Sequence, residues 1–316
     1  MNKCLCCFEN LKDDEKLYHK LCAQNLFQSS EPPEIDFSEK EWEKLALTFL
    51  AKHIAVTGVQ KKLSLQLHSE NKKSRLTIVG ALGGQYILKP PTKEYPWMPE
   101  LECLTMRLAD ICEIKVAPYG LVLLQDKSRA YLTKRFDRIG QQKLACEDLC
   151  QLSELLTEHK YKSTAEKTGK IIKKYSTFPG DDLLRYFELT VFSFLTGNAD
   201  MHLKNFSLLR DLKGVIRLSP AYDLLSTRLL IPIKEDKEEL VLSVNGKKSN
   251  LKRKDFKLFA ENLKIPEKSM NFIIEKLLSN IENMITIIQK SFLPKKMQDE
   301  YEKLMREREG RLKVVV

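Results

Sequence analysis

The chain has 316 residues, of which 43% are hydrophobic and 30% charged, so it can build a sizeable core and is not a disordered tail. It contains no run near 18 apolar residues, and its charged N-terminus lacks the apolar stretch of a secretory signal. A net charge of +10 favours an anionic partner without identifying it. We therefore expect a cytoplasmic protein with two domains or one bilobal unit and no membrane partner.

Residues 1–34 form a Cys-rich segment and a linker. The eight cysteines of a chain without a secretory signal are expected to remain mostly free thiols. Four side chains in this segment follow a C-x2-C and H-x2-C spacing that tetrahedral Zn²⁺ accepts: Cys4, Cys7, His19 and Cys22. Because Cys and His beside the apolar "LYHKLC" also fit ordinary packing, the sequence leaves zinc binding and packing both open.

Residues 35–142 have the pattern of a β-rich N-terminal lobe. A Pro pair and a Ser38-x-x-Glu41 capping pattern predict a linker and then a helix. Short β-rich runs from "HIAVTGVQKKLSLQL" to "GGQYILKPP" predict an antiparallel sheet. An amphipathic helix beginning at "MPELECL", a turn around Pro118 and a strand in "AYLTKRFDR" complete the lobe.

Residues 143–316 predict a mostly helical C-terminal lobe, which makes the expected fold class α+β. Helices are expected in "LCQLSELLTEHKY", in "DDLLRYFELTVFSFLTGN" and from Lys252 to the end, with a strand pair in "NFSLLRDLKGVIRL". The charged tail "LPKKMQDEYEKLMREREGRLKVVV" predicts a solvent-exposed helix rather than an interaction device.

The run "GNADMHLKNFSLL" bridges two hydrophobic segments with an Asp, a His and an Asn. Phosphoryl transfer needs a carboxylate that orients the attacking hydroxyl and oxygen ligands for Mg²⁺. Asp200 and Asn205 have the five-residue offset of a protein-kinase catalytic loop, and Asp223 in "LSPAYDLLST" offers a further carboxylate to the metal. Asp and Asn are also common in turns, so a loop that only caps the next strand stays open.

Upstream segments offer the remaining parts of such a site. Lys89 in "YILKPP" could contact phosphates and pair with Glu102, although an exposed strand-end lysine and a solvated glutamate are the ordinary alternatives. "TGVQKK" could cover phosphates but is neither a Walker sequence nor GxGxxG. "KRFDR" lies where a kinase hinge would hold adenine, although a basic linker between the lobes is equally compatible with it. His202, between Asp200 and Asn205, is expected to fix that loop by hydrogen bonds rather than to titrate.

Six segments in this order resemble those of a known family, the HipA-like serine/threonine kinase toxins of bacterial toxin–antitoxin modules. They are "TGVQKKL" for the Gly-containing loop, "YILKP" for the phosphate lysine, "KRFDR" for the hinge, "CEDLCQL" for the start of the large lobe, "GNADMHLKNFSLL" for the catalytic loop and "LSPAYDLLS" for the metal-binding element. The resemblance covers most of the chain.

The resemblance implies a bilobal protein-kinase-like fold, ATP with Mg²⁺, and transfer to Ser or Thr of a protein, typically an aminoacyl-tRNA synthetase, which halts translation. It makes Asp200 the catalytic aspartate and Asn205 and Asp223 the metal ligands. The residues that it implies at the nucleotide are Thr57, Gly58, Val59, Gln60, Lys61, Lys62, Lys89, Lys134, Arg135, Phe136, His202, Asn205, Tyr222 and Asp223.

Departures from the family pattern point to its shorter HipT branch. With Gly58 so close to the start, the chain has no room for the extra N-terminal subdomain, which in that branch is a separate small protein. Known kinases of the branch favour tryptophanyl-tRNA synthetase, and the further expected partner is a DNA-binding antitoxin. The loop reads "IAVTG", so Ala55 and Thr57 stand where the family can carry two serines, and Thr57 becomes the autophosphorylation candidate.

Two other functions stay open from the sequence. The first is a small-molecule phosphotransferase on the same fold, and the second is a catalytically silent binding subunit of an antitoxin–DNA complex. The presence of Lys89, Asp200, Asn205 and Asp223 argues against the silent subunit. DNA contact is expected to be indirect, because no helix-turn-helix with clustered basic residues is visible.

Overall fold

The computed structural model describes residues 2–35, 62–70, 73–80, 83–140 and 142–313. These residues divide into two compact units. Unit 1 comprises Met1–Cys103, Ala117–Gln142 and Lys290–Phe292, and unit 2 comprises Leu104–Val116, Lys143–Gln289 and Leu293–Val316. The helix predicted after Ser38 lies outside the described residues. Within the described ranges, no helix is both long enough and apolar enough to span a bilayer.

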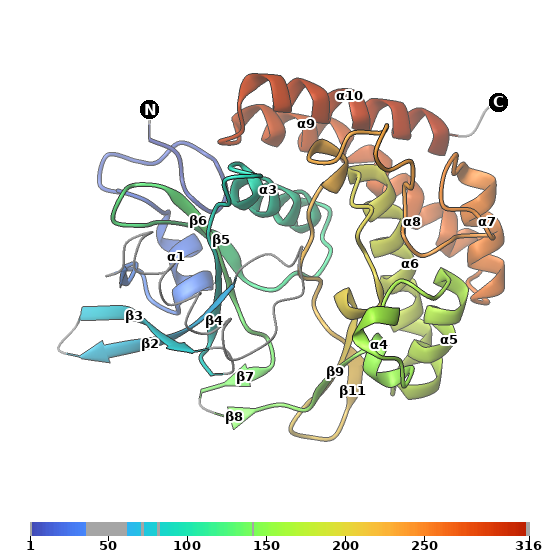
Figure 1. Cartoon of the computed structure of the whole chain (residues 1–316), viewed down its shortest axis with the longest axis horizontal. Coiled ribbons are helices and arrows are strands. Elements are labelled where there is room, and N and C mark those ends of the chain that lie inside the picture. Colours follow the sequence, from blue (N-terminus) through green and yellow to red (C-terminus); the bar gives the residue numbers. More distant parts are fainter. Residues whose placement is uncertain (1, 36–61, 71–72, 81–82, 141, 314–316) are drawn as a thin grey trace. The chain divides into compact units, whose positions relative to one another are not determined.

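Unit 1 is built on a six-stranded sheet with the order β1-β3-β2-β4-β6-β5 (Figure 1). Its strands are β1 (Glu34–Ile35), β2 (Leu63–Glu70), β3 (Lys73–Gly80), β4 (Tyr86–Lys89), β5 (Tyr119–Leu123) and β6 (Arg129–Lys134). β1 pairs parallel with β3, whereas the remaining neighbours are antiparallel. The predicted antiparallel sheet is therefore confirmed for β2 to β6.

Two helices and two short strands accompany this sheet: α1 (Lys20–Phe27), α3 (Met98–Ile111), β7 (Arg138–Ile139) and β8 (Gln142–Lys143). The division between the units falls within α3 and within β8. The alternation of the strands buries Leu65, Tyr86, Leu88 and Leu132 completely, as expected where one sheet face forms a core.

Unit 2 is mainly helical, as the sequence predicts. Its helices are α4 (Leu149–Leu152), α5 (Ala165–Tyr175), α6 (Pro179–Thr196), α7 (Arg253–Asn262), α8 (Glu267–Ser279), α9 (Ile281–Lys290) and α10 (Lys295–Leu312). Short 3₁₀ turns cover Thr157–His159, Leu203–Asn205 and Thr227–Leu229. The strands β9 (Cys146–Asp148), β10 (Ser207–Arg210) and β11 (Ile216–Leu218) form a small sheet, which includes the predicted strand pair.

The core of unit 2 is organised around α6, which contacts α5, α8 and α10 (Figure 1). Its apolar residues bury an aromatic layer, in which the ring centroids of Phe187 and Phe259 are 5.6 Å apart and those of Phe194 and Phe256 are 5.2 Å apart. Close aromatic pairs of this kind contribute beyond the area that they bury. α6 is therefore the fixed element from which the following loop begins.

The prediction of one helix throughout "LCQLSELLTEHKY" is correct only for the first turn of this segment and wrong for the rest. α4 ends at Leu152, and Glu154 adopts a left-handed backbone with φ of 57°. The Leu155 N–H then donates to the Cys150 carbonyl at 3.1 Å, which satisfies a carbonyl that a continuing helix would have used. Only the 3₁₀ turn Thr157–His159 follows before α5.

The prediction of a solvent-exposed C-terminal helix is also wrong, because α10 packs one face into unit 2. Tyr301, Met305 and Leu312 are fully buried, and Arg308 is 2% exposed. The Arg308 guanidinium lies 4.9 Å from the Phe194 ring and donates to the Phe194 carbonyl. The many charges of the tail therefore conceal an apolar stripe at helical spacing.

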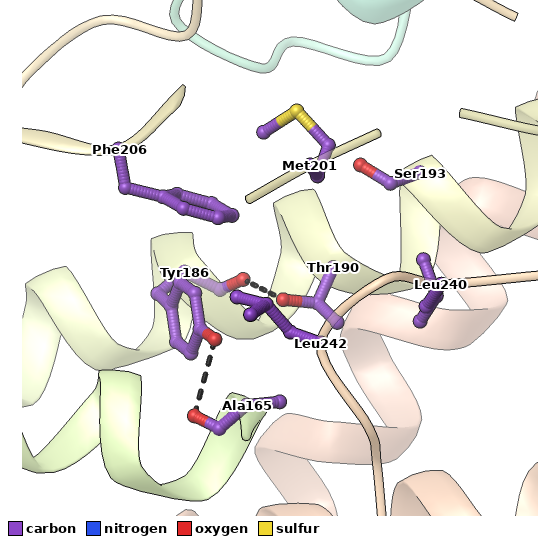
Figure 2. Close-up of a pocket in the computed structure, with 8 residues that line it drawn as sticks. All are labelled: Ala165, Tyr186, Thr190, Ser193, Met201, Phe206, Leu240 and Leu242. Carbon is purple, nitrogen blue, oxygen red and sulfur yellow. Dashed lines mark hydrogen bonds between the residues drawn. The ribbon is translucent and has the colours of Figure 1, made fainter. Parts of the chain in front are cut away.

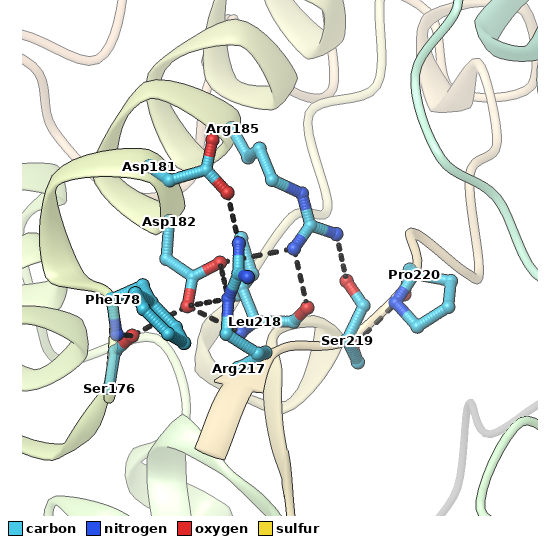
Figure 3. A network of polar contacts seen from close by, with 9 residues as sticks. All are labelled: Ser176, Phe178, Asp181, Asp182, Arg185, Arg217, Leu218, Ser219 and Pro220. Carbon is cyan, nitrogen blue, oxygen red and sulfur yellow. Dashed lines mark hydrogen bonds and ion pairs between the residues drawn. The ribbon is translucent and has the colours of Figure 1, made fainter. Parts of the chain in front are cut away.

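A polar network ties α6 to β11 (Figure 3). The Asp182 carboxylate is fully buried and accepts hydrogen bonds from Arg185 at 3.1 Å, from Arg217 at 3.2 Å, and from the Leu218 N–H at 2.9 Å. The Ser176 hydroxyl donates to it as well, at 2.6 Å. A buried carboxylate is tolerated when cations and donors surround it in this way.

We expect Asp182→Ala to lower the free energy of unfolding by about 3 kcal/mol, because it leaves two arginines without their buried partner. Urea denaturation of the full chain measures the change. Asp181 is the matched control, since its side chain is 60% exposed although it also pairs with Arg217. Asp181→Ala should cost less than about 1 kcal/mol, and equal losses for both variants would contradict the assignment.

Candidate functional site

The loop after α6 begins with a glycine that the backbone requires. Gly197 caps the helix with φ of 75°, and a Cβ there would lie 2.6 Å from the Leu304 side chain. The left-handed conformation and the lack of space both select glycine. Asn198 follows fully buried, and its side-chain oxygen accepts from the Asp200 N–H at 3.3 Å.

Backbone hydrogen bonds hold this loop from both sides. The Ala199 N–H donates to Thr227 Oγ1 at 2.9 Å, while the Ala199 carbonyl accepts from the Val241 N–H at 3.1 Å. The Arg228 N–H donates to the Gly197 carbonyl at 3.1 Å. These bonds anchor the loop within unit 2.

Beneath the loop lies a small pocket that is lined by α6, by the start of α5 and by segments that follow α6 (Figure 2). Its lining is mostly apolar and comprises Ala165, Tyr186, Thr190, Ser193, Met201, Phe206, Leu240 and Leu242. The Thr190 hydroxyl donates to the Tyr186 carbonyl at 2.8 Å and the Tyr186 hydroxyl to the Ala165 carbonyl at 3.1 Å. Because these polar groups are bonded within the protein, the pocket supports the loop and offers no recognition groups for a nucleotide.

Asp200 and Asn205 belong to one compact turn. The Asp200 carbonyl accepts from the His202 N–H at 2.8 Å and from the Asn205 side-chain amide at 2.9 Å. The Asn205 N–H donates to the His202 carbonyl at 2.9 Å. Since the amide nitrogen of Asn205 is used in this way, its amide oxygen is the end that could ligate a cation.

Asp223 is tied to the same turn through its neighbour. The Tyr222 hydroxyl donates to the Lys204 carbonyl at 2.8 Å and lies 2.6 Å from Ser207 Oγ. Asp223 itself adopts a left-handed backbone with φ of 58°, which is uncommon outside glycine and asparagine. Strained conformations of this kind cluster at functional sites.

The electrostatics of the turn are those of two carboxylates that repel each other. Desolvation by the surrounding protein raises the pKa of Asp200 to about 6, the charge of Asp223 adds to the rise, and the Lys160 ammonium opposes it. The Asp200 side chain nevertheless remains 51% exposed, so it is accessible to a reactant. Paired carboxylates with an amide oxygen nearby have the composition of a Mg²⁺ site.

Within the part of the chain that the structure describes, the His202 ring does not make the hydrogen bonds by which it was predicted to fix the loop. Its Nδ1 is buried and has no hydrogen-bond partner among the described residues, and its Nε2 is 4.0 Å from Asp200 Oδ2. The ring instead makes an edge contact with Tyr161, with centroids 5.1 Å apart. Burial, with a contribution from Lys160, lowers the pKa of His202 to about 4, so the imidazole is neutral near pH 7, in agreement with the prediction that it does not titrate.

Sequence reasoning missed Lys160 and Tyr161. The Lys160 carbonyl accepts from the Leu203 N–H at 3.2 Å, and its ammonium lies 4.8 Å from the Tyr161 ring centroid. Desolvation and the Asp200 charge raise the pKa of Tyr161 to about 12, so the hydroxyl stays protonated beside that carboxylate. The only signal was a cation next to an aromatic residue in "EHKYKS", which is too common to identify a site.

In unit 1, Lys89 and Glu102 form a buried ion pair. Lys89 Nζ lies 2.6 Å from Glu102 Oε1, and the two residues are 8% and 1% exposed. β4 and α3 carry these side chains, and the Lys89 ammonium also lies 5.5 Å from the Tyr131 ring. The prediction of the pair is confirmed, whereas an exposed lysine and a solvated glutamate are both excluded.

The "KRFDR" segment contains its own charge cluster. The Arg135 guanidinium makes two hydrogen bonds of 2.9 Å to the Asp137 carboxylate, and Arg138 contacts the same group. Burial alone would raise the pKa of Asp137, but the two guanidinium groups hold it below its usual range. Burial lowers the pKa of Lys134. The Arg135 side chain is thus used within the segment, and its part in a hinge remains a prediction, as does that of Phe136.

The predicted Gly-containing loop falls mostly outside the described residues. Thr57, Gly58, Val59, Gln60 and Lys61 lie there together with Ala55. Lys62 is described, and it is exposed directly ahead of β2. Any role of these residues at a nucleotide remains a prediction.

Comparison with known proteins identifies the family. The model of the HipA-like C-terminal domain matches residues 54–285. The chain belongs to the HipA-like C-terminal domain family. The match includes both candidate segments of unit 2 and the strand that carries Lys89, which is the range expected from the ordered motifs.

Two curated relatives of this HipA-like chain are both named as kinases. "Putative kinase Y4dM" of Sinorhizobium fredii is 33% identical over 230 residues, which cover 69% of this chain and 54% of the relative. A "Putative kinase" of Haemophilus influenzae is 27% identical over 330 residues, which cover 93% of this chain and 92% of the relative. The chain thus spans about half the length of the first relative and nearly all of the second.

Two solved structures share the fold. A chain of the Shewanella oneidensis toxin–antitoxin complex of HipA, HipB and operator DNA matches with a TM-score of 0.68 at 21% identity, covering 82% of this chain and 65% of that one. The Helicobacter pylori proinflammatory kinase CtkA matches with a TM-score of 0.53 at 16% identity, covering 78% and 90%. The α+β, bilobal protein-kinase-like fold of this HipA-like chain is therefore as predicted.

Proposed function

We propose that this HipA-like chain is an ATP- and Mg²⁺-dependent serine/threonine protein kinase that acts as a bacterial toxin. The observation that carries the proposal is an arrangement within unit 2. Asp200 and Asn205 share one turn, the Tyr222 hydroxyl donates to the Lys204 carbonyl of that turn, and the charge of the adjacent Asp223 raises the pKa of Asp200. The kinase names of the two relatives support the same reaction class.

Each group has a distinct part in this reaction. Asp200 orients the attacking hydroxyl and accepts its proton, and the Asn205 amide oxygen and the Asp223 carboxylate would hold Mg²⁺. Lys89, oriented by Glu102, contacts the nucleotide phosphates. When bound there, Mg²⁺ would neutralise the charge that develops on the transferred phosphoryl group. Lys160 lowers the pKa of Asp200 and so keeps more of that carboxylate in the ionised form that can accept a proton.

The proposed substrate is an aminoacyl-tRNA synthetase. Among these enzymes the favoured one is tryptophanyl-tRNA synthetase, as expected for the HipT branch.

The proposed partners are two proteins. One is a separate small protein that takes the place of the N-terminal subdomain, and the other is a DNA-binding antitoxin, through which alone the chain contacts DNA. The Shewanella complex, which contains HipA, HipB and operator DNA, supports such an assembly. Thr57 is the proposed autophosphorylation site, and the proposed location is the cytoplasm.

Incubation with labelled ATP, Mg²⁺ and either a cell lysate or purified tryptophanyl-tRNA synthetase tests the function. We expect label on the synthetase and on the chain itself, with Thr57 identified by mass spectrometry. Label on small metabolites alone would instead support a small-molecule phosphotransferase. Absence of any transfer would favour the silent binding subunit.

Glu102→Gln tests the buried ion pair. The amide still accepts a hydrogen bond but leaves the buried Lys89 ammonium without its compensating charge. We therefore expect the free energy of unfolding to fall by about 3 kcal/mol, the lower end of the range for breaking a buried ion pair. We also expect turnover to fall because the lysine loses its orientation. Urea denaturation and the transfer assay measure the two effects.

Glu94→Gln serves as the control for Glu102→Gln, because Glu94 is an exposed glutamate in the same unit. It should leave stability within about 0.5 kcal/mol of the parent chain. If Glu102→Gln turned over at the parental rate, the pair would be a structural feature without a part in phosphate binding.

A further inference from the structure

We propose that Cys4, Cys7, His19 and Cys22 bind one Zn²⁺. The metal would cross-link residues 4–22, here called the zinc segment, and so stabilise their packing on the sheet of unit 1. One possible ligand atom from each of the four residues lies within 4.8 Å of the others. A tetrahedral site with Zn–S of about 2.3 Å and Zn–N of about 2.0 Å separates its ligands by about 3.5–3.8 Å. Only a small inward movement is therefore needed.

Local backbone structure explains why the four side chains meet. A turn returns the chain after Cys4, since the Phe8 N–H donates to the Cys4 carbonyl at 3.0 Å and the Cys4 N–H to the Glu9 carbonyl at 2.8 Å. His19 is the N-cap residue of α1, and Cys22 lies in its first turn. Residues three apart share a helix face, and the helix N-terminus favours the thiolate form that zinc requires.

The hydrogen bonds of His19 are those of a zinc ligand. Its Nδ1 is 3.2 Å from Cys7 Sγ, within the cluster, while its Nε2 is 3.1 Å from the Asn10 carbonyl. The Glu15 carboxylate lies 3.6 Å from the same Nε2. A metal-bound imidazole characteristically donates its second ring N–H to a carbonyl or carboxylate, which fixes the tautomer and the ring orientation.

Ordinary packing does not account for this cluster. Packing explains Cys4, which is fully buried, and Cys6, which is 7% exposed and is not one of the four. It does not explain why Cys7, His19 and Cys22, all partly exposed, direct polar atoms toward one another. Zinc binding gives these atoms a common partner, with the three thiols releasing their protons as the metal binds.

Residues in and next to the zinc segment make hydrogen bonds with the strands of unit 1. The Leu121 N–H of β5 donates to the Leu5 carbonyl at 2.9 Å, and the Tyr18 hydroxyl donates to the Leu121 carbonyl at 2.7 Å. The Tyr86 hydroxyl of β4 donates to the carbonyl of Leu26 in α1 at 3.0 Å. The helix α1, which carries Cys22, is thus bonded to β4, the strand that also carries Lys89.

Metal analysis of the full chain tests the proposal. Protein purified with a phosphine reductant and without chelator should contain one zinc per chain by elemental mass spectrometry. Cys22→Ser and His19→Ala should each lose at least about nine-tenths of it, whereas Cys6→Ala and Cys146→Ser should keep one equivalent. Removal of zinc from the parent chain should lower its melting temperature and speed amide exchange at Leu5 and Leu121.

A second readout avoids dependence on how well the ligand variants fold. Parent chain reconstituted with Co²⁺ should show the ligand-field bands of a tetrahedral ion together with thiolate-to-cobalt charge transfer, which Zn²⁺ abolishes. Reduced parent chain that takes up neither metal stoichiometrically would overturn the proposal, as would full zinc retention in both Cys22→Ser and His19→Ala. These outcomes concern metal content alone and are independent of the proposed kinase activity.

Discussion

Asp200→Asn is expected to lower phosphoryl transfer by about 10²–10⁴-fold, the range for loss of a positioned general base. The loop itself should survive, because its hydrogen bonds to His202 and Asn205 use the Asp200 backbone carbonyl rather than the carboxylate. Nucleotide affinity should remain largely unchanged, since the proposed role of the carboxylate is to orient the hydroxyl rather than to hold ATP. Single-turnover transfer and calorimetry with an ATP analogue measure these two quantities separately.

The pH dependence of transfer provides a second test of Asp200. Its raised pKa of about 6 means that the carboxylate, which must be ionised to accept a proton, becomes protonated as the pH falls through that value. The parent rate should therefore decline below about pH 6, and the residual rate of Asp200→Asn should show no such decline. A variant that keeps the parental rate, or the same acidic limb, would remove Asp200 from catalysis.

The parts of the site that the sequence predicts are those fixed by short-range spacing. Asp200 and Asn205 are five residues apart, and one turn after a glycine-capped helix is enough to bring them together. The Lys89–Glu102 pair joins neighbouring elements and combines two charges that a core tolerates only as partners. Local pattern and elementary electrostatics suffice in both cases.

The parts that the sequence does not reveal depend on contacts between distant segments. Lys160 and Tyr161 reach the turn at His202 only because α4 stops after one turn, and that ending depends on the left-handed backbone of Glu154, a residue that ordinarily favours helices. In α10 the buried stripe was hidden by a high content of charge. Arg308 can be buried on this stripe because its guanidinium donates to the Phe194 carbonyl and packs on the Phe194 ring. The sequence around Arg308 does not reveal these contacts, because Phe194 lies on a different helix.

Asp223→Asn is expected to weaken Mg²⁺–ATP binding by about 100-fold or more. Even a residue that only hydrogen-bonds to a metal ligand typically costs about 10–100-fold in metal affinity when it is lost. Asn is the informative replacement because it tolerates the left-handed backbone that Asp223 adopts, so the fold is preserved while the charge is removed. Titration with ATP alone should show little change, which would place the loss at the metal. Calorimetry with and without Mg²⁺ distinguishes the two contributions.

Asp236→Asn is the matched control for Asp223→Asn. The Asp236 charge also raises the pKa of Asp200, but its side-chain oxygen accepts from the Glu238 N–H at 2.8 Å, a hydrogen bond that an amide oxygen can keep. If the affinity for Mg²⁺–ATP fell only because unit 2 had lost one negative charge, both variants would show the same fall. If Asp223 ligates Mg²⁺, only Asp223→Asn should lose affinity. Unchanged Mg²⁺–ATP affinity in Asp223→Asn would leave Asn205 without its carboxylate partner, and the turn at Asp200 could then no longer be assigned to a metal-dependent kinase.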